Sequence, residues 1–546
     1  MNYNELAELL FPNTDMTPEY CETLYPERSL PAGARVTRLG PSPTGFVHLG
    51  NLYVAFTNER LARQSDGVFF LRIEDTDSKR EVPGAAEELI SALDYYGIRF
   101  DEGVTLSGES GGYGPYRQSR RGDIYQCLVK RLVSEGKAYP CFLAAEELDD
   151  IRASQEAAKL TPGVYGEWAA HRTLPLEDVR RRLGAGESYV IRLRARGDSE
   201  TYFTIPDGIR GELSMPENTM DVVLLKKDGL PTYHFAHVAD DHLMRTTHVI
   251  RGEEWIASLP IHIALFDALN WKPPVYCHTA VLMKQEGETK RKLSKRKDPE
   301  FSLAYYRAEG YHPSAVREYL MTIINSNFEE WRAENPNASP DAFTFTTGKM
   351  SRSGILFDND KLNDVSKEVL LGIPAAELAA FLTEWAEQNG RPETLLLKSD
   401  MRYLERILDI GRHGANPRKD LSHGSQILSF IGYFYDEPVT PEDDLPENVP
   451  REDVPVLLGG YLKSYEHGDD QAAWFDRIRT LSEENGYAAK PKDFKKNPEL
   501  YKGHVGDVST VIRIALTGRR NSPDLWEIQQ ILGEDRTRAR IAAHIS

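Results

Sequence analysis

The sequence predicts an α/β fold: a doubly wound parallel-sheet nucleotide-binding domain with an α+β insertion, followed by a mainly α-helical C-terminal half. The first supporting observation is a short strand at 35–39, a turn rich in Pro and Gly, and a helix in which Leu49, Leu52 and Phe56 recur at spacings of three and four. A buried strand at 68–73 completes a strand, helix, strand unit that is expected to be parallel and right-handed. The second observation is the helical periodicity of most of the second half of the chain.

The patterns that follow this first unit change twice along the chain. A mixture of helical and alternating stretches at 131–220 predicts an insertion between two halves of the sheet. Parallel-strand character returns at 221–225 and at 248–250, and a helix is expected at 256–269. The six segments predicted in this way are an N-terminal extension (1–33), the first half of the nucleotide-binding domain (34–130), the insertion (131–220), the second half of that domain (221–297), a connecting domain (298–370) and a helical region (371–546).

The composition is that of a soluble globular protein, with 40% apolar and 27% charged residues among 546. No apolar run approaches the roughly 18 residues that a membrane span requires, and the N-terminus lacks the basic and apolar regions of a secretory signal. We therefore expect a cytoplasmic protein with no membrane partner. The spacing of the four cysteines argues against a disulfide framework and against a zinc site, and predicts buried or free thiols at Cys21, Cys127, Cys141 and Cys277.

The net charge of −18 lowers the expectation of nucleic-acid binding, because affinity for phosphate backbones comes mainly from Lys and Arg. Basic residues nevertheless cluster at 284–297, at 490–502 and at Arg519 and Arg520. An acidic protein can therefore still present a basic face to a polyanion.

The stretch 41–50 reads PSPTGFVHLG and joins the first predicted strand to its helix. Its two prolines stiffen the turn, and its Thr-Gly pair lets the backbone bend. We expect His48 and Gly50 at or beside the helix N-terminus, where free N–H groups and the helix dipole favour phosphate. There His48 can donate to a phosphate oxygen or to a leaving group, and Gly50 leaves room for a base or a ribose. The alternative is a rigid loop with a surface histidine.

A second stretch, 290–297, carries six cationic side chains in eight residues. A solvated basic loop is the alternative interpretation of such a run. Displacement at phosphorus builds negative charge on the attacked and departing oxygens, and mobile lysines can follow that charge. Lys292 and Lys295 lie three residues apart and could both reach phosphates from one face.

Five ordered motifs resemble those of the glutamyl-tRNA synthetases, a family of class I aminoacyl-tRNA synthetases: PSPTG-x-x-HLG at 41–50, RIEDTD at 72–77, GPYRQS at 114–119, the stretch 231–255, and KLSKR at 292–296. The resemblance is close over about 36–370 and fainter over 506–541. In that family the first and last motifs are the two ATP-binding signatures. The residues that the resemblance places against ATP, with its Mg²⁺, are Pro41, Ser42, Pro43, Thr44, Gly45, His48, Gly50, Lys292, Ser294, Lys295 and Arg296.

The resemblance implies formation of glutamyl-adenylate followed by transfer to a ribose hydroxyl at the 3′ end of tRNA. It assigns catalysis to His48, Lys292 and Lys295, which stabilise charge without a covalent nucleophile. Glutamate itself needs a carboxylate for its ammonium group and guanidinium groups for its anions. The glutamate-binding residues implied at matching positions are Arg38, Ser42, Glu74, Tyr233, His237 and Arg251.

Each of these residues also has an alternative: Arg38 and Glu74 could pair with each other, and Tyr233 could be a core aromatic. Arg38 is the expected partner of the side-chain carboxylate. His237 departs from the family pattern, in which this position is Asn or a small apolar residue. Adjacent carboxylates at Asp240 and Asp241 rarely face one ion together, so no metal site is predicted there. The insertion of the resembled family can carry zinc-binding cysteines, but only Cys141 lies near that place, so zinc is expected to be absent.

The resemblance also implies the partners and the use of each segment. The insertion would hold the tRNA acceptor end, the connecting domain would contact the stem, and the helical region would bind the anticodon. The expected partners are L-glutamate and tRNA(Glu), with tRNA(Gln) left open, and a monomer is expected. The competing hypotheses are a catalytically idle tRNA-binding paralogue and a tRNA-independent adenylate-forming enzyme.

Overall fold

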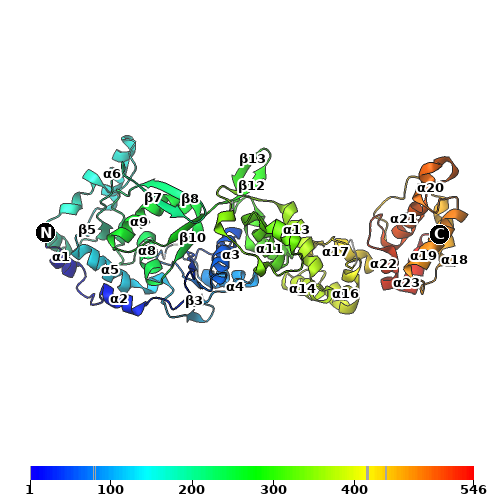
Figure 1. Ribbon diagram of the computed structural model, residues 1–546, viewed down its shortest axis with the longest axis horizontal. Coiled ribbons are helices and arrows are strands. Elements are labelled where there is room, and N and C mark those ends of the chain that lie inside the picture. The colour runs from blue at the N-terminus through cyan, green and yellow to red at the C-terminus, as the bar shows by residue number, and fades with distance from the viewer. Residues whose placement is uncertain (1, 78, 80, 414–416, 437–438, 546) are drawn as a thin grey trace. The chain divides into compact units, whose positions relative to one another are not determined.

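The computed structural model describes residues 2–77, 79, 81–413, 417–436 and 439–545. The chain divides into two compact units, and each is described by itself. Unit 1 comprises 1–305 and 320–358, and unit 2 comprises 306–319 and 359–546. Figure 1 shows strands and helices together in the first part of the chain and helices in its last part.

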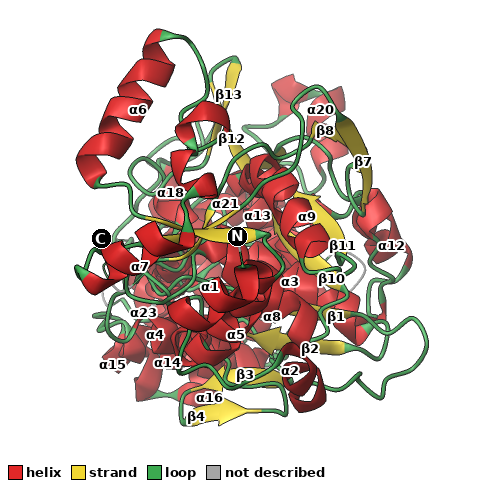
Figure 2. Ribbon diagram, turned by 90° about the vertical axis from the view of Figure 1, so that its left-hand side faces the viewer, coloured by secondary structure: helices red, strands yellow, loops and turns green. Residues whose placement is uncertain are grey.

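Parallel strands form the centre of unit 1. The strand at 35–39 and the strand at 68–73 are confirmed as β1 and β2, which pair in parallel, and β3 pairs in parallel with β2. Strand β10 pairs in parallel with β11, and the amide of Thr247 donates to the carbonyl of Val36 at 3.0 Å, where β10 meets β1. Figure 2 shows the resulting order β4, β3, β2, β1, β10, β11. The bounds are β1 (Val36–Leu39), β2 (Val68–Leu71), β3 (Glu102–Thr105), β4 (Gly108–Ser110), β10 (His248–Gly252) and β11 (Val275–Thr279).

The helices that connect these strands bury apolar faces in the core of unit 1. Leu49, Leu52 and Phe56 are all buried on α3, as their spacing predicts. The helix expected at 256–269 begins as a 3₁₀ turn at Glu253–Ser258 and becomes an α-helix only at Leu259. The bounds are α3 (Leu49–Arg63), α4 (Ala85–Tyr95), α5 (Gly122–Ser134), α8 (Tyr233–Leu243) and α9 (Leu259–Ala268).

Two strands of the insertion, β5 and β6, form an antiparallel sheet with β9, which follows directly after the insertion. The prediction of a parallel strand at 221–225 is wrong, because the strand there, β9, pairs antiparallel with β6. A hairpin, β7 and β8, leaves the insertion and joins the edge of the main sheet beside β11. The bounds are β5 (Ala138–Cys141), α6 (Ala145–Ala157), α7 (Leu176–Gly184), β6 (Val190–Leu193), β7 (Tyr202–Asp207), β8 (Gly211–Pro216) and β9 (Val223–Leu225).

The N-terminal extension is packed onto unit 1. Helices α1 (Tyr3–Leu10) and α2 (Pro18–Leu24) lie beside α5, as Figure 1 shows at the blue end of the chain. Leu6 and Cys21 are buried in the same apolar core as Leu128 of α5. Glu22 pairs with His242 and Arg245 at the end of α8, which ties the extension to that helix.

The basic stretch 290–297 begins on a β-hairpin, which is extended by a third strand, β14. The remaining elements that involve unit 1 are β12 (Leu282–Glu286), β13 (Thr289–Lys292), α11 (Pro313–Ile324), α12 (Phe328–Glu334) and β14 (Ile355–Phe357). Helix α10 (Leu303–Glu309) and helix α11 each begin in one unit and end in the other.

Unit 2 is helical, as its periodicity predicts, and one apolar core runs through it from Leu370 to Ile541. Its helices are α13 (Asn359–Gly372), α14 (Ala375–Gln388), α15 (Thr394–Ser399), α16 (Met401–Asp409), α17 (Ile427–Ile431), α18 (Asp453–Ser464), α19 (Gln471–Glu484), α20 (Pro491–Lys496), α21 (Val505–Thr517), α22 (Leu525–Leu532) and α23 (Glu534–Ala543).

The four cysteines are free and buried, as the sequence predicts. Within the described part of the chain, no helix is long and apolar enough to cross a membrane.

Candidate active site

A cleft of about 1010 Å³ lies at the carboxyl ends of β1, β10 and β11. Leu39 and Gly40 line it at the end of β1, and Arg251 and Thr279 line it at the ends of β10 and β11. The strand order reverses between β1 and β10, and ligands of open α/β sheets bind at such a switch point. The predicted residues that line this cleft are Arg38, Pro41, Ser42, Pro43, Thr44, His48, Gly50, Glu74, Tyr233, Arg251 and Lys292.

The other predicted residues do not line this cleft. Gly45 lines a smaller neighbouring cavity of about 220 Å³ together with His48. Lys295 contacts the loop at 41–50 instead, since its Nζ lies 3.9 Å from the ring centre of Phe46. Ser294 and Arg296 belong to the turn between Lys292 and Asp298.

His48 is the N-cap of α3, as the sequence predicts. Its Nδ1 accepts the backbone N–H of Asn51 at 3.3 Å, and the Asn51 side chain accepts the N–H of His48 at 3.0 Å. Burial, with Lys292 nearby, lowers the pKa of His48 to about 4, so the ring is neutral at pH 7. A neutral ring that accepts at Nδ1 carries its proton on Nε2, which is therefore a hydrogen-bond donor.

Asp298 organises the basic turn. It is 2% exposed and takes two hydrogen bonds from Arg291, Nη1 to Oδ2 at 2.6 Å and Nη2 to Oδ1 at 2.7 Å. The backbone N–H of Ser294 also donates to its Oδ2 at 2.9 Å. Arg291 is thereby held by a carboxylate, whereas the neighbouring Lys292 is exposed and lines the cleft.

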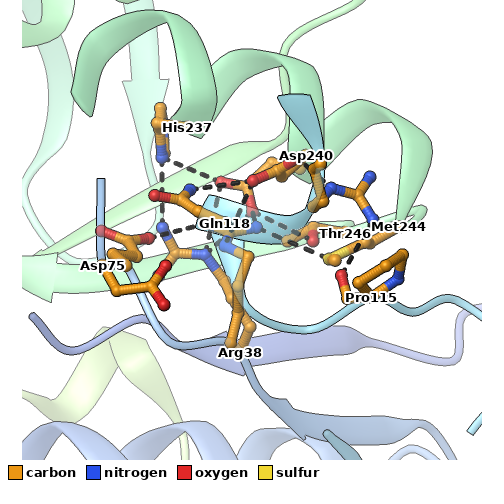
Figure 3. A network of polar contacts seen from close by, with 12 residues as sticks. Arg38, Asp75, Pro115, Gln118, His237, Asp240, Met244 and Thr246 are labelled. Atoms are coloured by element: carbon orange, nitrogen blue, oxygen red, sulfur yellow. Dashed lines mark hydrogen bonds and ion pairs between the residues drawn. The ribbon is translucent and has the colours of Figure 1, made fainter. Parts of the chain in front are cut away.

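A buried network of arginines and carboxylates lies beside the cleft, and Figure 3 labels Arg38 and Asp240 among its members. Asp241 of α8 accepts Nε of Arg38 at 3.1 Å and Nη1 of Arg72 at 2.7 Å. Burial alone would raise the pKa of Asp241, but Arg38 and Arg72 outweigh it and lower the pKa. Asp240, beside it, accepts Nε of Arg121 at 2.7 Å. The network fixes Arg38 while leaving its Nη1 without a hydrogen-bond partner in the described part of the chain.

Glu74 does not pair with Arg38 but with Arg72, whose Nη2 donates to Oε1 at 2.9 Å. Burial raises the pKa of Glu74, while Arg72 and Arg38 act in the opposite direction. A Cβ atom on Gly40 would lie 2.4 Å from Oε1 of Glu74, so this position leaves the space that the carboxylate occupies. Tyr233 stands nearby, and burial raises its pKa to about 12.

His237 is fully buried and lies behind Arg38 instead of in the cleft. Its Nδ1 is 3.0 Å from Oδ2 of Asp241 and 3.3 Å from Nη2 of Arg38, and its Nε2 is 3.1 Å from the hydroxyl of Tyr276. Because the carboxylate only accepts, the Nδ1–H tautomer satisfies both Asp241 and the donating hydroxyl of Tyr276. The ring therefore supports Arg38 through Asp241.

Arg251 is held by neutral groups. Its Nε donates to Nε2 of His278 at 3.0 Å, its Nη1 lies 3.1 Å from Nδ1 of His262, and its Nη2 lies 3.4 Å from the carbonyl oxygen of Trp255. Burial lowers the pKa of both histidines, that of His262 well below its usual value. No carboxylate forms an ion pair with Arg251 within the described ranges, so its charge is available to an anion in the cleft.

The sequence did not predict the residues that fix the cleft arginines by hydrogen bonds. Asp240 and Asp241 were considered only as a possible metal pair, Arg72 was noted only as part of the RIEDTD motif, and Arg121 and His278 were not predicted. One signal was available: two adjacent acids on an apolar helix must both be paired when that helix is buried.

Both halves of the chain match families of known proteins. Residues 35–363 match the family model "tRNA synthetases class I (E and Q), catalytic domain", and 377–545 match "Anticodon binding domain". A glutamate–tRNA ligase of Acetivibrio thermocellus is 57% identical over 542 residues, covering 99% of each chain. One of Clostridium perfringens strain 13 is 48% identical over 546 residues, covering 99% of this chain and 100% of the relative.

Solved structures agree with this result. The crystal structure of a glutamate tRNA ligase from Elizabethkingia meningosepticum, in complex with its amino acid, is 28% identical with a TM-score of 0.74. It covers 94% of this chain and 99% of its own. The relatives match from end to end, so the N-terminal extension is shared with them. The chain belongs to the class I tRNA synthetases of the glutamate and glutamine group, with a catalytic domain followed by an anticodon-binding domain.

Proposed function

We propose that this protein ligates L-glutamate to the 3′ end of tRNA(Glu), using ATP and passing through glutamyl-adenylate. The observation that carries the proposal is the cleft at the switch point, which gathers two arginines and a buried glutamate with His48 and Lys292. Full-length similarity to proteins named glutamate–tRNA ligase supports the same activity. The α-carboxylate would attack the α-phosphorus, pyrophosphate would leave, and a ribose hydroxyl of the tRNA would then attack the activated carbonyl.

The glutamate-binding half of the proposal rests on charge. The side-chain carboxylate would meet the open Nη1 edge of Arg38, and Arg251 would face the substrate as a cation without an acidic partner. Glu74 would take the ammonium group, with Tyr233 as a hydrogen-bonding neighbour and Ser42 at the mouth of the cleft. His237 would act through Arg38, since it does not reach the cleft.

The ATP-binding half rests on the two signature segments. The Nε2–H of His48 would donate to a phosphate oxygen, and the exposed Lys292 and Lys295 would follow the charge that develops on pyrophosphate. Among the residues that the structure describes, no cluster of three His, Cys, Asp or Glu could hold a metal ion. We therefore propose that Mg²⁺ arrives on the triphosphate, where it would neutralise phosphate charge.

Three of the six segments predicted from the sequence are proposed to bind different parts of the tRNA. The insertion would hold the acceptor end, the connecting domain the stem, and the helical region the anticodon. In unit 2 a cavity of about 470 Å³ is lined by Trp474, Phe475 and Arg513, and the guanidinium of Arg479 lies 4.7 Å from the ring centre of Phe475. Aromatic and arginine faces of this kind can stack unpaired bases.

Aminoacylation with radiolabelled glutamate and ATP tests the proposal, with purified tRNA(Glu) and tRNA(Gln) supplied separately. Charging of tRNA(Glu) alone is the expected result. Charging of both would identify a non-discriminating enzyme. Charging of neither, with no glutamate-dependent pyrophosphate exchange in the presence of tRNA, would favour the idle paralogue. Formation of a glutamate product that survives RNase treatment would favour a tRNA-independent enzyme.

A further inference from the structure

Arg251 is positioned by a hydrogen-bonded chain that begins outside the cleft. Asp207, the last residue of β7, lies 2.6 Å through its Oδ2 from Nδ1 of His278 on β11. Nε2 of the same ring accepts Nε–H of Arg251 on β10 at 3.0 Å. Both Asp207 and His278 are buried, at 5% and 0% exposure. This series of hydrogen bonds therefore crosses three neighbouring strands of one sheet, β7, β11 and β10.

The donors and acceptors available fix the proton positions in this hydrogen-bonded series. Arginine has only donors, so Nε2 of His278 must be unprotonated. The proton of the neutral ring then sits on Nδ1 and is donated to the carboxylate of Asp207. Asp207 thereby selects the one tautomer of His278 that can hold Arg251.

From this geometry we infer that Asp207 and His278 are positioning residues for glutamate binding: Asp207 sets the tautomer of His278, and His278 fixes the guanidinium of Arg251 against the substrate carboxylate. The inference rests on the proposed function, in which Arg251 contacts glutamate. It assigns a role in the glutamate pocket to the β7–β8 hairpin, which comes from the insertion and touches the main sheet at its edge.

Asp207 also stabilises a local turn. A test must separate this role from its role in the hydrogen-bonded relay from Asp207 through His278 to Arg251. Its Oδ1 accepts the backbone N–H groups of Ile209 and Arg210, each at 2.9 Å, in the turn after β7. In Asp207→Asn the amide oxygen can keep these two bonds, and the NH₂ group then faces Nδ1 of His278. The ring must accept there and carry its proton on Nε2, against Nε–H of Arg251.

The expected result for Asp207→Asn is a rise of about tenfold or more in the glutamate KM and Kd, as for a lost hydrogen bond to a charged group. The ATP KM should change much less. Pyrophosphate exchange in the presence of tRNA gives the KM for glutamate and the KM for ATP. Calorimetry of glutamate binding gives the glutamate Kd without turnover. Asp267→Asn, at an exposed position on α9, is the matched control and should leave all three constants unchanged.

A second variant separates the relay from the turn. In His278→Gln the side-chain oxygen can replace Nε2 as the acceptor for Arg251, and it needs no tautomer. Asp207→Asn should therefore add little to the glutamate KM when it is combined with His278→Gln, whereas His278→Phe should raise that KM as Asp207→Asn does. A double variant as impaired as the sum of its single variants would show that Asp207 acts only through the turn and would overturn the relay.

Arg251→Gln distinguishes this inference from the proposed function. An unchanged glutamate KM in Arg251→Gln would overturn the assignment of Arg251 and the relay with it. A raised glutamate KM in Arg251→Gln, together with unchanged values in Asp207→Asn and His278→Phe, would overturn the relay alone. If Asp207→Asn does not fold, the comparison of His278→Gln with His278→Phe decides, and equal glutamate KM values in these two variants would overturn the relay.

Discussion

Oδ1 of Asp241 lies 2.7 Å from Nη1 of Arg72, and neither side chain is exposed to solvent at all. The pair is the centre of the network that holds Arg38 at the end of β1. Removing one member of a buried ion pair leaves an uncompensated charge, which is strongly destabilising.

Asp241→Asn should therefore lower the free energy of unfolding by about 3–5 kcal/mol. Urea denaturation followed by circular dichroism would show a lower midpoint for the transition of unit 1. Asp267→Asn, which changes an exposed acid, should stay within about 0.5 kcal/mol of the wild type. Equal midpoints for the two variants would contradict the role of Asp241.

His48 has two roles: its Nδ1 caps α3, and its Nε2–H is a hydrogen-bond donor. Two substitutions separate these roles. Asn at position 48 can still accept at the place of Nδ1, whereas Ala cannot, so only His48→Ala should lose about 1 kcal/mol of stability. Both variants lose the Nε2–H donor and should slow adenylate formation by about 10²-fold. Thermal unfolding and single-turnover adenylate formation measure the two effects. Wild-type rates in His48→Asn would show that the histidine is only a cap.

Asp298→Ala should disorder the basic turn. Arg291 and the N–H of Ser294 would lose their common acceptor, and Lys292 would spend less time at the cleft. The ATP KM in pyrophosphate exchange should rise by about tenfold, with little change in the glutamate KM. Glu286→Ala is the matched control, because Glu286 contacts the same Arg291 from a side chain that is 58% exposed. An effect of the same size in the control would contradict the special role of Asp298.

Stability should fall between pH 6.5 and pH 4. Burial lowers the pKa of His48, His234, His248 and His312 to about 4 from the usual 6.5. The unfolded chain then binds more protons than the folded chain in this window, so the stabilisation is complete above pH 6.5 and is lost as the pH falls toward 4.

The midpoint of urea unfolding, measured from pH 4.5 to pH 7.5, checks this pH dependence. His312→Gln should make the dependence shallower for the transition of unit 2. His413→Gln, at a side chain that is 82% exposed, should not. The same slope in the wild type and in both variants would rule out the contribution of His312.

Local patterns were enough to predict the first parallel unit, the helical second half and the place of His48 at the start of α3. Leu49, Leu52 and Phe56 report the buried face of α3 directly, because helical spacing brings them onto one side. The same reasoning failed for β9. An apolar run of a few residues is equally compatible with a parallel and an antiparallel neighbour, and only the partner strand decides.

The sequence by itself determined the first strand, helix, strand unit, the helical second half and the place of His48 at a helix N-terminus, since these depend on local spacing and residue type, and the resemblance of its motifs indicated the family. The tertiary structure decided which charges are paired. It placed Arg38 on Asp241 instead of Glu74, moved His237 behind the pocket, and joined Asp207 to Arg251 through His278. Such contacts join residues far apart in the chain, and their energy depends on distance and burial, which spacing along the chain does not encode.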